Sequence, residues 1–166
     1  NPTILVFPAC ESFEVPLFPP YGWTSIKTAG TGNPGTWDRQ TSGTYPACAP
    51  HTGAGMTRYN SYNLANGTAG ILVSPPVNFP SDLYRVEFWM YRDDGYPALD
   101  PVENSANQWY KYQFDMPPGS MGMNRYVIFE AVSQYGNNMF IDDICLDVQP
   151  LCQEPTSLSV ATTAHT

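Results

Sequence analysis

Clusters of turn-forming residues divide this chain into short segments that favour β-strands. The 166 residues include 17 prolines and 13 glycines, and no run shows the 3.6-residue period of an amphipathic helix. Short β-prone runs separated by such turns predict an all-β protein, which we expect to be a jelly-roll β-sandwich of two antiparallel sheets. The expected strands are residues 3–7, 23–28, 36–39, 56–62, 70–74, 83–92, 108–116, 126–133 and 139–148.

Acidic residues gather near both ends of the chain. The first and last strands of an all-β domain often lie side by side, so these carboxylates are expected to meet at one point. Carboxylates repel one another unless something neutralises them, and the whole chain holds only seven Lys and Arg residues. Ca²⁺, a hard cation that takes oxygen ligands, is the expected neutraliser and would act as a structural clamp. The predicted metal ligands are Glu11, Glu14, Asp142 and Asp143.

Two questions about this acidic site stay open in the sequence. Loop residues such as Asn33, Asp38 and Asn138 would be able to add ligands, and nothing selects among them. Alternatively, Asp142 and Asp143 accept turn or backbone hydrogen bonds and bind no metal. The acidic turn at 93–95 is a weaker metal candidate and is expected to be solvated.

Four cysteines are present, at positions 10, 48, 145 and 152, and none forms a Cys-x-x-Cys pair. The two histidines, His51 and His165, show no zinc-like spacing. We expect a disulfide that ties the terminal strands, joining Cys10 to either Cys145 or Cys152. Such a bond fits an extracellular or cell-surface location.

The net charge of −8 argues against nucleic acid as a partner, because phosphate binding needs a basic patch. The apolar runs are too short to span a bilayer, so we expect no direct membrane insertion. The chain has the character of a piece of a longer protein.

The two longest strands present contrasting faces. In residues 83–92, Val86, Phe88 and Met90 are expected in the core, because side chains alternate along a strand. If this strand shares a sheet with residues 109–114, the outward side chains form an aromatic and polar surface of the kind that binds sugars. The candidate ligand-binding residues are Arg85, Trp89, Tyr91, Trp109 and Lys111. Alternatively, an end loop or a neighbouring domain covers these rings.

The sequence predicts no catalytic residues. It contains no Gly-x-Ser-x-Gly elbow and no phosphate-binding glycine loop with a lysine. His51 lies in a glycine-rich loop, where a histidine is more often a packing residue than a general base. A glycosidase would need two opposed carboxylates in a cleft, and nothing places Glu87 and Glu130 opposite each other. We therefore expect a protein that is not an enzyme.

The order of several motifs resembles that of MAM domains, and in particular their bacterial branch. That branch is the cleaved adhesin domain, found in the haemagglutinin/adhesin regions of gingipain-type surface proteins. The resemblance covers residues 10–150 and implies a jelly roll, structural Ca²⁺ at the four acidic residues named above, and adhesion rather than catalysis. The motifs are 11–14, 22–23, 37–39, 51–56, 69–75, 129–131 and 141–144, while 18–23 and 88–92 are closer to the bacterial branch.

Two departures from this family pattern stand out. Gly22 replaces a cysteine that many animal MAM domains carry, and the segment 93–107 is shorter than in relatives, which place another strand and hairpin there. We divide the chain into a lead-in strand or linker at 1–9, the sandwich at 10–152, and 153–166. This last segment is expected to be a linker and the truncated start of a fibronectin type III-like module.

The sequence thus predicts a calcium-stabilised, non-catalytic adhesion module of a secreted or surface-attached bacterial protein. Its expected partners are a host extracellular protein, a haem protein or a glycan, besides neighbouring domains of its own polypeptide. Two alternatives stay open: a carbohydrate-binding accessory module of a secreted hydrolase, and a structural spacer domain.

Overall fold

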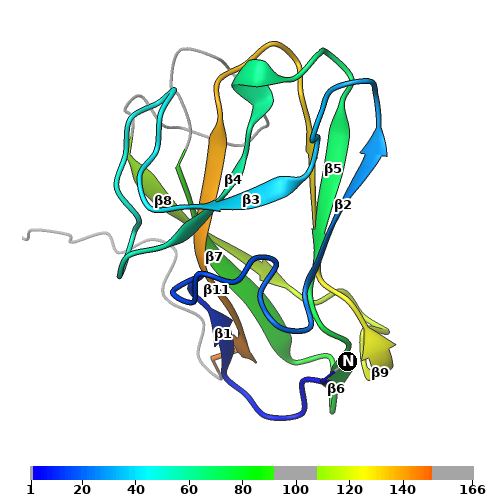
Figure 1. Cartoon of the computed structure of the whole chain (residues 1–166). Helices are drawn as coiled ribbons and strands as arrows, with labels where there is room; N and C mark the ends of the chain where they lie inside the picture. The colour runs from blue at the N-terminus through cyan, green and yellow to red at the C-terminus, as the bar shows by residue number, and fades with distance from the viewer. Residues whose placement is uncertain (1, 92–107, 151–166) are drawn as a thin grey trace, which may run out of the picture.

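Two antiparallel β-sheets pack face to face in the computed structural model, which describes residues 2–91 and 108–150 (Figure 1). The predicted β-sandwich is confirmed. One short 3₁₀ helix, η1 (Ser61–Asn63), accompanies the strands. The strands are β1 (Ala9–Glu11), β2 (Thr24–Ala29), β3 (Trp37–Gln40), β4 (Met56–Tyr59), β5 (Ala69–Val73), β6 (Val77–Phe79), β7 (Tyr84–Tyr91), β8 (Trp109–Asp115), β9 (Gly122–Arg125), β10 (Ile128–Val132) and β11 (Met139–Val148).

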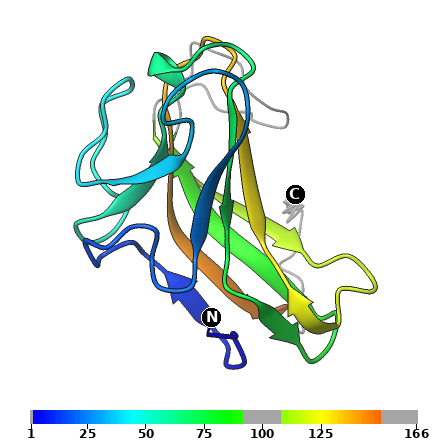
Figure 2. The same ribbon diagram turned by 45° about the vertical axis from the view of Figure 1, so that its right-hand side comes forward.

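The larger sheet has the strand order β3-β4-β11-β7-β8, with β1 also paired to β11, and the smaller sheet has the order β10-β5-β2. Strands β6 and β9 form a separate two-stranded ribbon. The turned view shows the two layers, with β2, β5 and β10 in front of β11 and β7 (Figure 2). Strand β11 is central because it pairs with β7 on one side and with both β4 and β1 on the other.

The core lies between the two sheets and follows the alternation of the strands. Val86, Phe88 and Met90 of β7 are buried, as predicted. The ring of Phe88 meets Phe129 of the opposite sheet edge to face, with 5.0 Å between ring centroids. Trp37 of β3 is 2% exposed, and its indole Nε1 donates to the carbonyl of Gly70 on β5 at 3.2 Å. This hydrogen bond joins the two sheets directly.

Most of the expected strands agree with the observed strands within a residue or two. Residues 3–7, expected as part of a lead-in strand or linker, contribute an isolated bridge between Ile4 and Val77. The side chains of Leu5 and Val6 are exposed, whereas Ile4 and Phe7 are partly buried and pack against the core. Strands β1, β6 and β9 were not predicted, because three or four residues carry too short a pattern. The segment 93–107 with its acidic turn, Cys152 and the expected linker 153–166 lie outside the described residues.

Candidate functional site

The first and last strands lie side by side. Strand β1 pairs with β11 so that Cys10 faces Cys145 and Glu11 faces Ile144. The two cysteines form a disulfide across 135 residues of sequence. Of the two pairings that the sequence left open, the structure contains this one. Cys48 is a free thiol in the described part of the chain, and burial raises its pKa to about 11, which disfavours the nucleophilic thiolate at neutral pH.

We call the region around Glu11, Glu14, Asp142 and Asp143 the acidic junction. An irregularity in β11 lies at its centre. Strand β11 pairs with β4 through residues 139–141 and with β1 through residues 144–146. Between these two pairings, the register with β7 shifts between Asp142 and Cys145. Asp143 has a φ of 48°, an uncommon backbone conformation for a residue other than glycine. The two aspartates therefore occupy the place where β11 changes its neighbour.

The loop 51–55 donates hydrogen bonds to both aspartates. The Oδ2 atom of Asp142 accepts from the backbone N–H of His51 at 2.9 Å and of Thr52 at 3.3 Å. The Oδ2 atom of Asp143 lies 2.6 Å from Nδ1 of His51, and its Oδ1 accepts from the Thr52 hydroxyl at 2.7 Å. An ionised carboxylate can only accept, so this contact places the imidazole proton on Nδ1.

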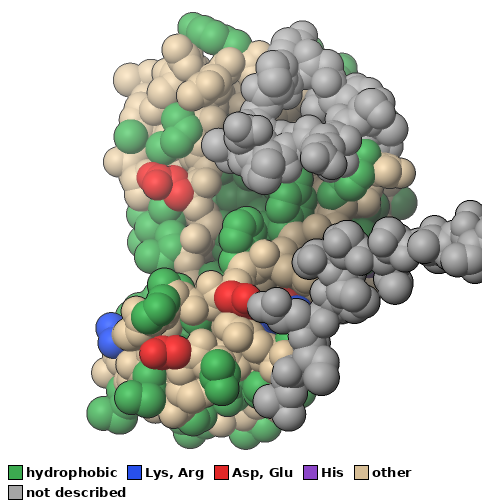
Figure 3. Space-filling view, turned by 180° about the vertical axis from the view of Figure 1, so that it is seen from behind, with side chains coloured by type: hydrophobic (Ala, Val, Ile, Leu, Met, Phe, Trp, Pro, Cys, Tyr) green, Lys and Arg blue, Asp and Glu red, His purple; other side chains and the backbone are tan. Residues whose placement is uncertain are grey.

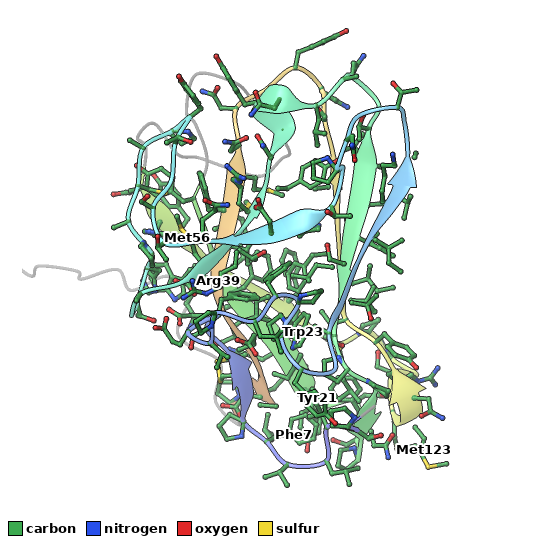
Figure 4. The ribbon with its side chains drawn as sticks, viewed as in Figure 1. Phe7, Tyr21, Trp23, Arg39, Met56 and Met123 are labelled. Carbon is green, nitrogen blue, oxygen red and sulfur yellow. A yellow bond between two sulfur atoms is a disulfide. The ribbon has the colours of Figure 1, made fainter. Side chains whose placement is uncertain are left out.

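The N-terminal turn, residues 11–14, also forms hydrogen bonds with the loop 51–55. The carboxylate of Glu14 accepts from the N–H groups of Ala54 at 2.8 Å and Gly55 at 3.3 Å. Arg39 lies next to this turn (Figure 4) and donates from Nε to the carbonyl of Phe13 at 2.5 Å. Glu11 instead closes its own turn, because its Oε1 accepts from the N–H of Phe13 at 2.7 Å. Both chain ends are thus tied to the loop 51–55.

Burial in this junction disfavours the charged forms of its carboxyl groups. Asp142 is 0% exposed, and desolvation, together with the nearby charge of Asp143, raises the pKa of Asp142 to about 6. The hydrogen bonds from Asp143, Thr52 and His51 lower that pKa and only partly offset the burial. Burial also raises the pKa of Glu11, with a smaller contribution from the charge of Glu14.

The four predicted metal ligands have oxygen donors of the type that Ca²⁺ takes. Across residues 2–91 and 108–150, however, no three acidic, histidine or cysteine side chains gather closely enough to hold a metal ion. Glu14, Asp142 and Asp143 accept hydrogen bonds from the loop instead. The donor chemistry therefore fits calcium, but the present arrangement is a hydrogen-bonded junction rather than a formed metal cage.

The other residues considered for this site have different roles. Asp38 forms a two-pronged ion pair with Arg58, at 3.0 Å from Nε and 2.6 Å from the second nitrogen. Asn138 is buried at the far end of the sandwich, where it connects three loops. Their side chains therefore serve other contacts than those of the acidic junction.

The five candidate ligand-binding residues share the outward face of β7 and β8. The antiparallel register places Trp89 opposite Lys111 and Tyr91 opposite Trp109. On this face Glu87 is the centre of a charged network: its carboxylate lies 2.9 Å from Lys111 Nζ and 3.2 Å from a guanidinium nitrogen of Arg85. These cations help to hold the pKa of Glu87 below its ordinary value despite its burial.

A loop covers part of this aromatic surface. The His51 ring stacks on Trp89 with 3.9 Å between ring centroids and 17° between planes. The indole Nε1 of Trp109 donates to the carbonyl of Ala49 at 3.0 Å, and the Tyr91 hydroxyl donates to that of Ala47 at 3.4 Å. The covered arrangement that the sequence left as an alternative is therefore present here. We name the outward face of β7 and β8, together with His51, the β7–β8 face.

His51 is the residue that sequence reasoning missed on this face. It links the two sites, because one side of its ring meets Trp89 and its Nδ1 meets Asp143. No local pattern indicates such a contact. A glycine-rich loop with one histidine predicts a turn, but it does not indicate which strand the histidine contacts.

Comparison with known proteins identifies solved structures that share this fold. No protein-family model matches the chain, and neither does any curated protein. Among solved structures, the K2 cleaved adhesin domain of Lys-gingipain has 19% identity and a TM-score of 0.55 over 86% of this chain and 98% of that domain. The K1 domain of Lys-gingipain from Porphyromonas gingivalis W83 has 16% identity and a TM-score of 0.52 over the same shares. The resemblance to cleaved adhesin domains is therefore confirmed at the level of the fold.

A structure of TmCBM61 in complex with β-1,4-galactotriose also matches, with 16% identity and a TM-score of 0.42 over 83% of this chain and 94% of that one. Within the described residues, no helix is long and apolar enough to cross a membrane.

Proposed function

We propose that this chain is a non-catalytic adhesion module of a secreted or surface-attached bacterial protein, and that it binds an extracellular protein through the β7–β8 face. A fold by itself hosts many functions, so the proposal depends on the site. The observation that carries it is the gathering of Trp89, Trp109 and Tyr91 beside Arg85 and Lys111 on one face.

The chemistry of this face suits a protein partner. Trp, Tyr and Arg are the residue types that contribute most to binding energy at protein interfaces. Here the rings are already held in place, since Trp89 is stacked on His51 and Trp109 is hydrogen bonded to Ala49. Side chains fixed before binding lose less conformational entropy on association. The face therefore offers rigid aromatic anchors next to two cations. Haem proteins belong to the same class of candidate partners.

A carbohydrate-binding accessory module is the second candidate, favoured by the same aromatic residues. The preceding loop already occupies part of this aromatic surface, because His51 stacks on Trp89 and Ala49 accepts the hydrogen bond of the Trp109 indole. The β7–β8 face thus fits a protein better than a glycan. A spacer domain is the third possibility, and it predicts that this face binds nothing.

We also propose that Ca²⁺ binds at the acidic junction, where Glu11, Glu14, Asp142 and Asp143 would hold it. The burial of Asp142 beside Asp143 supports this proposal, because a cation there would offset two adjacent negative charges. Bound calcium would supply structural reinforcement of the two termini. The loop 51–55 would have to release some of its hydrogen bonds to make room.

The test of the proposed function is binding to a panel of purified extracellular proteins that includes haemoglobin. Wild type is compared with Trp109→Ala and Lys111→Ala, and Lys27→Ala on β2 is the matched control. We expect the first two variants to weaken binding at least about tenfold, as typical hot-spot losses do, and the control to bind like wild type. Equal binding by all four proteins would rule out this face, and absence of any bound protein would favour the spacer.

A further inference from the structure

Three loops meet at the end of the sandwich that carries η1, and together they form a surface distinct from the β7–β8 face. They are residues 41–47, 60–67 and 133–138, which we call the tip. In Figure 1 the helix η1 and the loop before β11 lie side by side at the top, and Figure 2 shows the same arrangement. None of these three segments contains a Lys, Arg, Asp, Glu or His residue.

Tyrosine side chains are the largest exposed groups of the tip. The rings of Tyr45 and Tyr62 stack in parallel, with 4.1 Å between centroids and 8° between planes, and each remains at least half exposed. Tyr135, on the third loop, is 75% exposed. Aromatic side chains normally bury much of their surface, so three exposed rings at one end of a small domain indicate a surface that another molecule covers.

A buried asparagine holds these loops together. Asn138 is 2% exposed, and its backbone N–H donates to the carbonyl of Tyr45 at 2.6 Å. Its side-chain Nδ2 donates to the carbonyl of Thr44 at 2.8 Å, and its Oδ1 accepts from the N–H of Tyr62 at 3.1 Å. One side chain thus connects all three loops of the tip.

A second buried residue fixes the helix η1 below the tyrosines. Ser133 is 0% exposed, and its hydroxyl oxygen lies 3.1 Å from the carbonyl oxygens of both Ser61 and Leu64, which share its one proton; it accepts from the Ser61 hydroxyl at 3.1 Å. Tyr45 and Tyr135 have φ angles of 55° and 60°, which are uncommon for aromatic residues. Such conformations persist where the surroundings impose them, and they concentrate at binding sites.

We propose that the tip binds an uncharged glycan, with Tyr45, Tyr62 and Tyr135 as the aromatic contacts. A pyranose ring has an apolar C–H face, which packs on an aromatic ring, and a rim of hydroxyl groups, which donate and accept hydrogen bonds. The tip supplies both kinds of partner, because exposed Asn63, Asn66 and Gln134 lie on the same loops as the tyrosines. Tyr, Ser, Gly and Asn are also the residue types that antibody loops use for adaptable recognition.

The charge distribution favours an uncharged glycan over a charged one. The chain carries a net charge of −8, yet the tip has no charged residue. At the upper end of the rear view, the coloured side chains are hydrophobic or uncharged, while acidic and basic side chains lie further down (Figure 3). An anionic glycan would find no cation on these three described loops, and the net negative charge of the chain would repel it. A basic protein would find no carboxylate there either.

This inference deepens the proposed recognition role but uses a different surface from the β7–β8 face. The experiment is an array of neutral oligosaccharides, with sialylated and sulfated oligosaccharides as charged controls, followed by calorimetry with the best neutral ligand. The variants are Tyr62→Ala, Tyr62→Phe and Tyr135→Ala. Tyr21→Ala is the matched control, because Tyr21 is also highly exposed (79%) but lies toward the other end of the sandwich (Figure 4).

We expect wild type to bind neutral oligosaccharides and Tyr62→Ala to weaken that binding about five- to tenfold, the loss of one aromatic contact. Tyr62→Phe should keep most of the affinity because it keeps the stacked ring, Tyr135→Ala should weaken binding, and Tyr21→Ala should have no effect. Tyr62→Phe, Tyr135→Ala and Tyr21→Ala should melt like wild type, and Tyr62→Ala should lose no more stability than its stack on Tyr45 contributes.

The inference is overturned if wild type binds no neutral oligosaccharide, if it prefers the charged ones, or if Tyr62→Ala and Tyr135→Ala bind like wild type. Failure here is distinguishable from failure of the proposed function, because Trp109→Ala and Lys111→Ala leave the tip unchanged. Glycan binding lost in those two variants but kept in Tyr62→Ala would place the site on the β7–β8 face and would also overturn the inference.

Discussion

His51 and Asp143 are 92 residues apart in sequence, and Nδ1 of the first lies 2.6 Å from Oδ2 of the second. The same imidazole stacks on Trp89. One side chain therefore connects the acidic junction, which secures the two ends of the chain, to the aromatic face that we propose as the binding surface. A substitution that disrupts either region should therefore also affect the other.

Replacement of His51 tests this connection. His51→Ala removes both contacts and should lower the free energy of unfolding by about 2–4 kcal/mol, the sum of a hydrogen bond to a carboxylate and an aromatic stack. His51→Phe keeps the stack but not the hydrogen bond, so its loss should be smaller. Urea unfolding measures both. Stabilities within about 0.3 kcal/mol of wild type for both variants would show that the contacts do not contribute.

The buried carboxyl of Asp142 predicts a pH dependence. Its pKa is about 6 in the folded protein, against an ordinary value of 3.8 for an aspartate in water, so the folded protein binds this proton more tightly than the unfolded chain does. The associated stability is fully present below about pH 4 and is lost as the pH rises through about 6. That loss is on the order of 2–3 kcal/mol for a shift of about two pKa units.

Urea unfolding of wild type and Asp142→Asn between pH 4 and pH 7, in EDTA, measures this effect. The variant should gain stability relative to wild type as the pH rises, because an amide carries no charge to bury. Contributions from Glu11 are present in both proteins and cancel. A difference in stability that stays constant over this range would contradict the assignment to Asp142.

The strands of the larger sheet show what a sequence can predict. Alternation along a strand is set by the backbone alone, so the buried set Val86, Phe88 and Met90 and the outward set around Trp89 were correctly assigned. The meeting of the first and last strands was also predicted, as a consequence of an all-β fold. These features depend on local pattern and on general topology.

The contacts between loops and strands could not be predicted from the sequence. Whether Glu14, Asp142 and Asp143 bind a metal or accept hydrogen bonds from residues 51–55 depends on the path of a glycine-rich loop, which no periodicity encodes. In the run 3–7, β-propensity does not indicate which side chains are covered: Ile4 and Phe7 pack against the core, whereas Leu5 and Val6 stay exposed. The stacked tyrosines of the tip come from separate loops, and only the folded chain brings them together.

Calcium binding is tested by thermal unfolding in EDTA and then in excess free Ca²⁺. A ligand at 100 times its Kd stabilises the folded state by about 2.7 kcal/mol, which corresponds to a rise in Tm of roughly 5–10 °C for a domain of this size. We expect that rise in wild type and its absence in the double variant Asp142→Asn, Asp143→Asn. Glu130→Gln, which removes an exposed carboxylate on β10, is the control and should behave as wild type does. An unchanged wild-type Tm would refute the calcium proposal.

The disulfide between Cys10 and Cys145 should contribute strongly, because it closes a loop that spans most of the chain. The chain-entropy account assigns about 4–5 kcal/mol to a loop longer than 100 residues. The double variant Cys10→Ser, Cys145→Ser should therefore unfold at much lower urea concentration than wild type, and it should be insensitive to reductant. A loss below about 1 kcal/mol would show that the β1–β11 pairing is maintained without the bond.

The most direct measurement of the central claim is the affinity of the β7–β8 face for an extracellular protein. Surface plasmon resonance with the tightest partner from the panel compares wild type, Trp109→Ala, Lys111→Ala and Lys27→Ala, each checked for an unchanged melting curve. The account predicts at least about a tenfold loss for Trp109→Ala and a clear loss for Lys111→Ala, with none for Lys27→Ala. Wild-type affinity in both β8 variants would contradict the claim that this face is the binding surface.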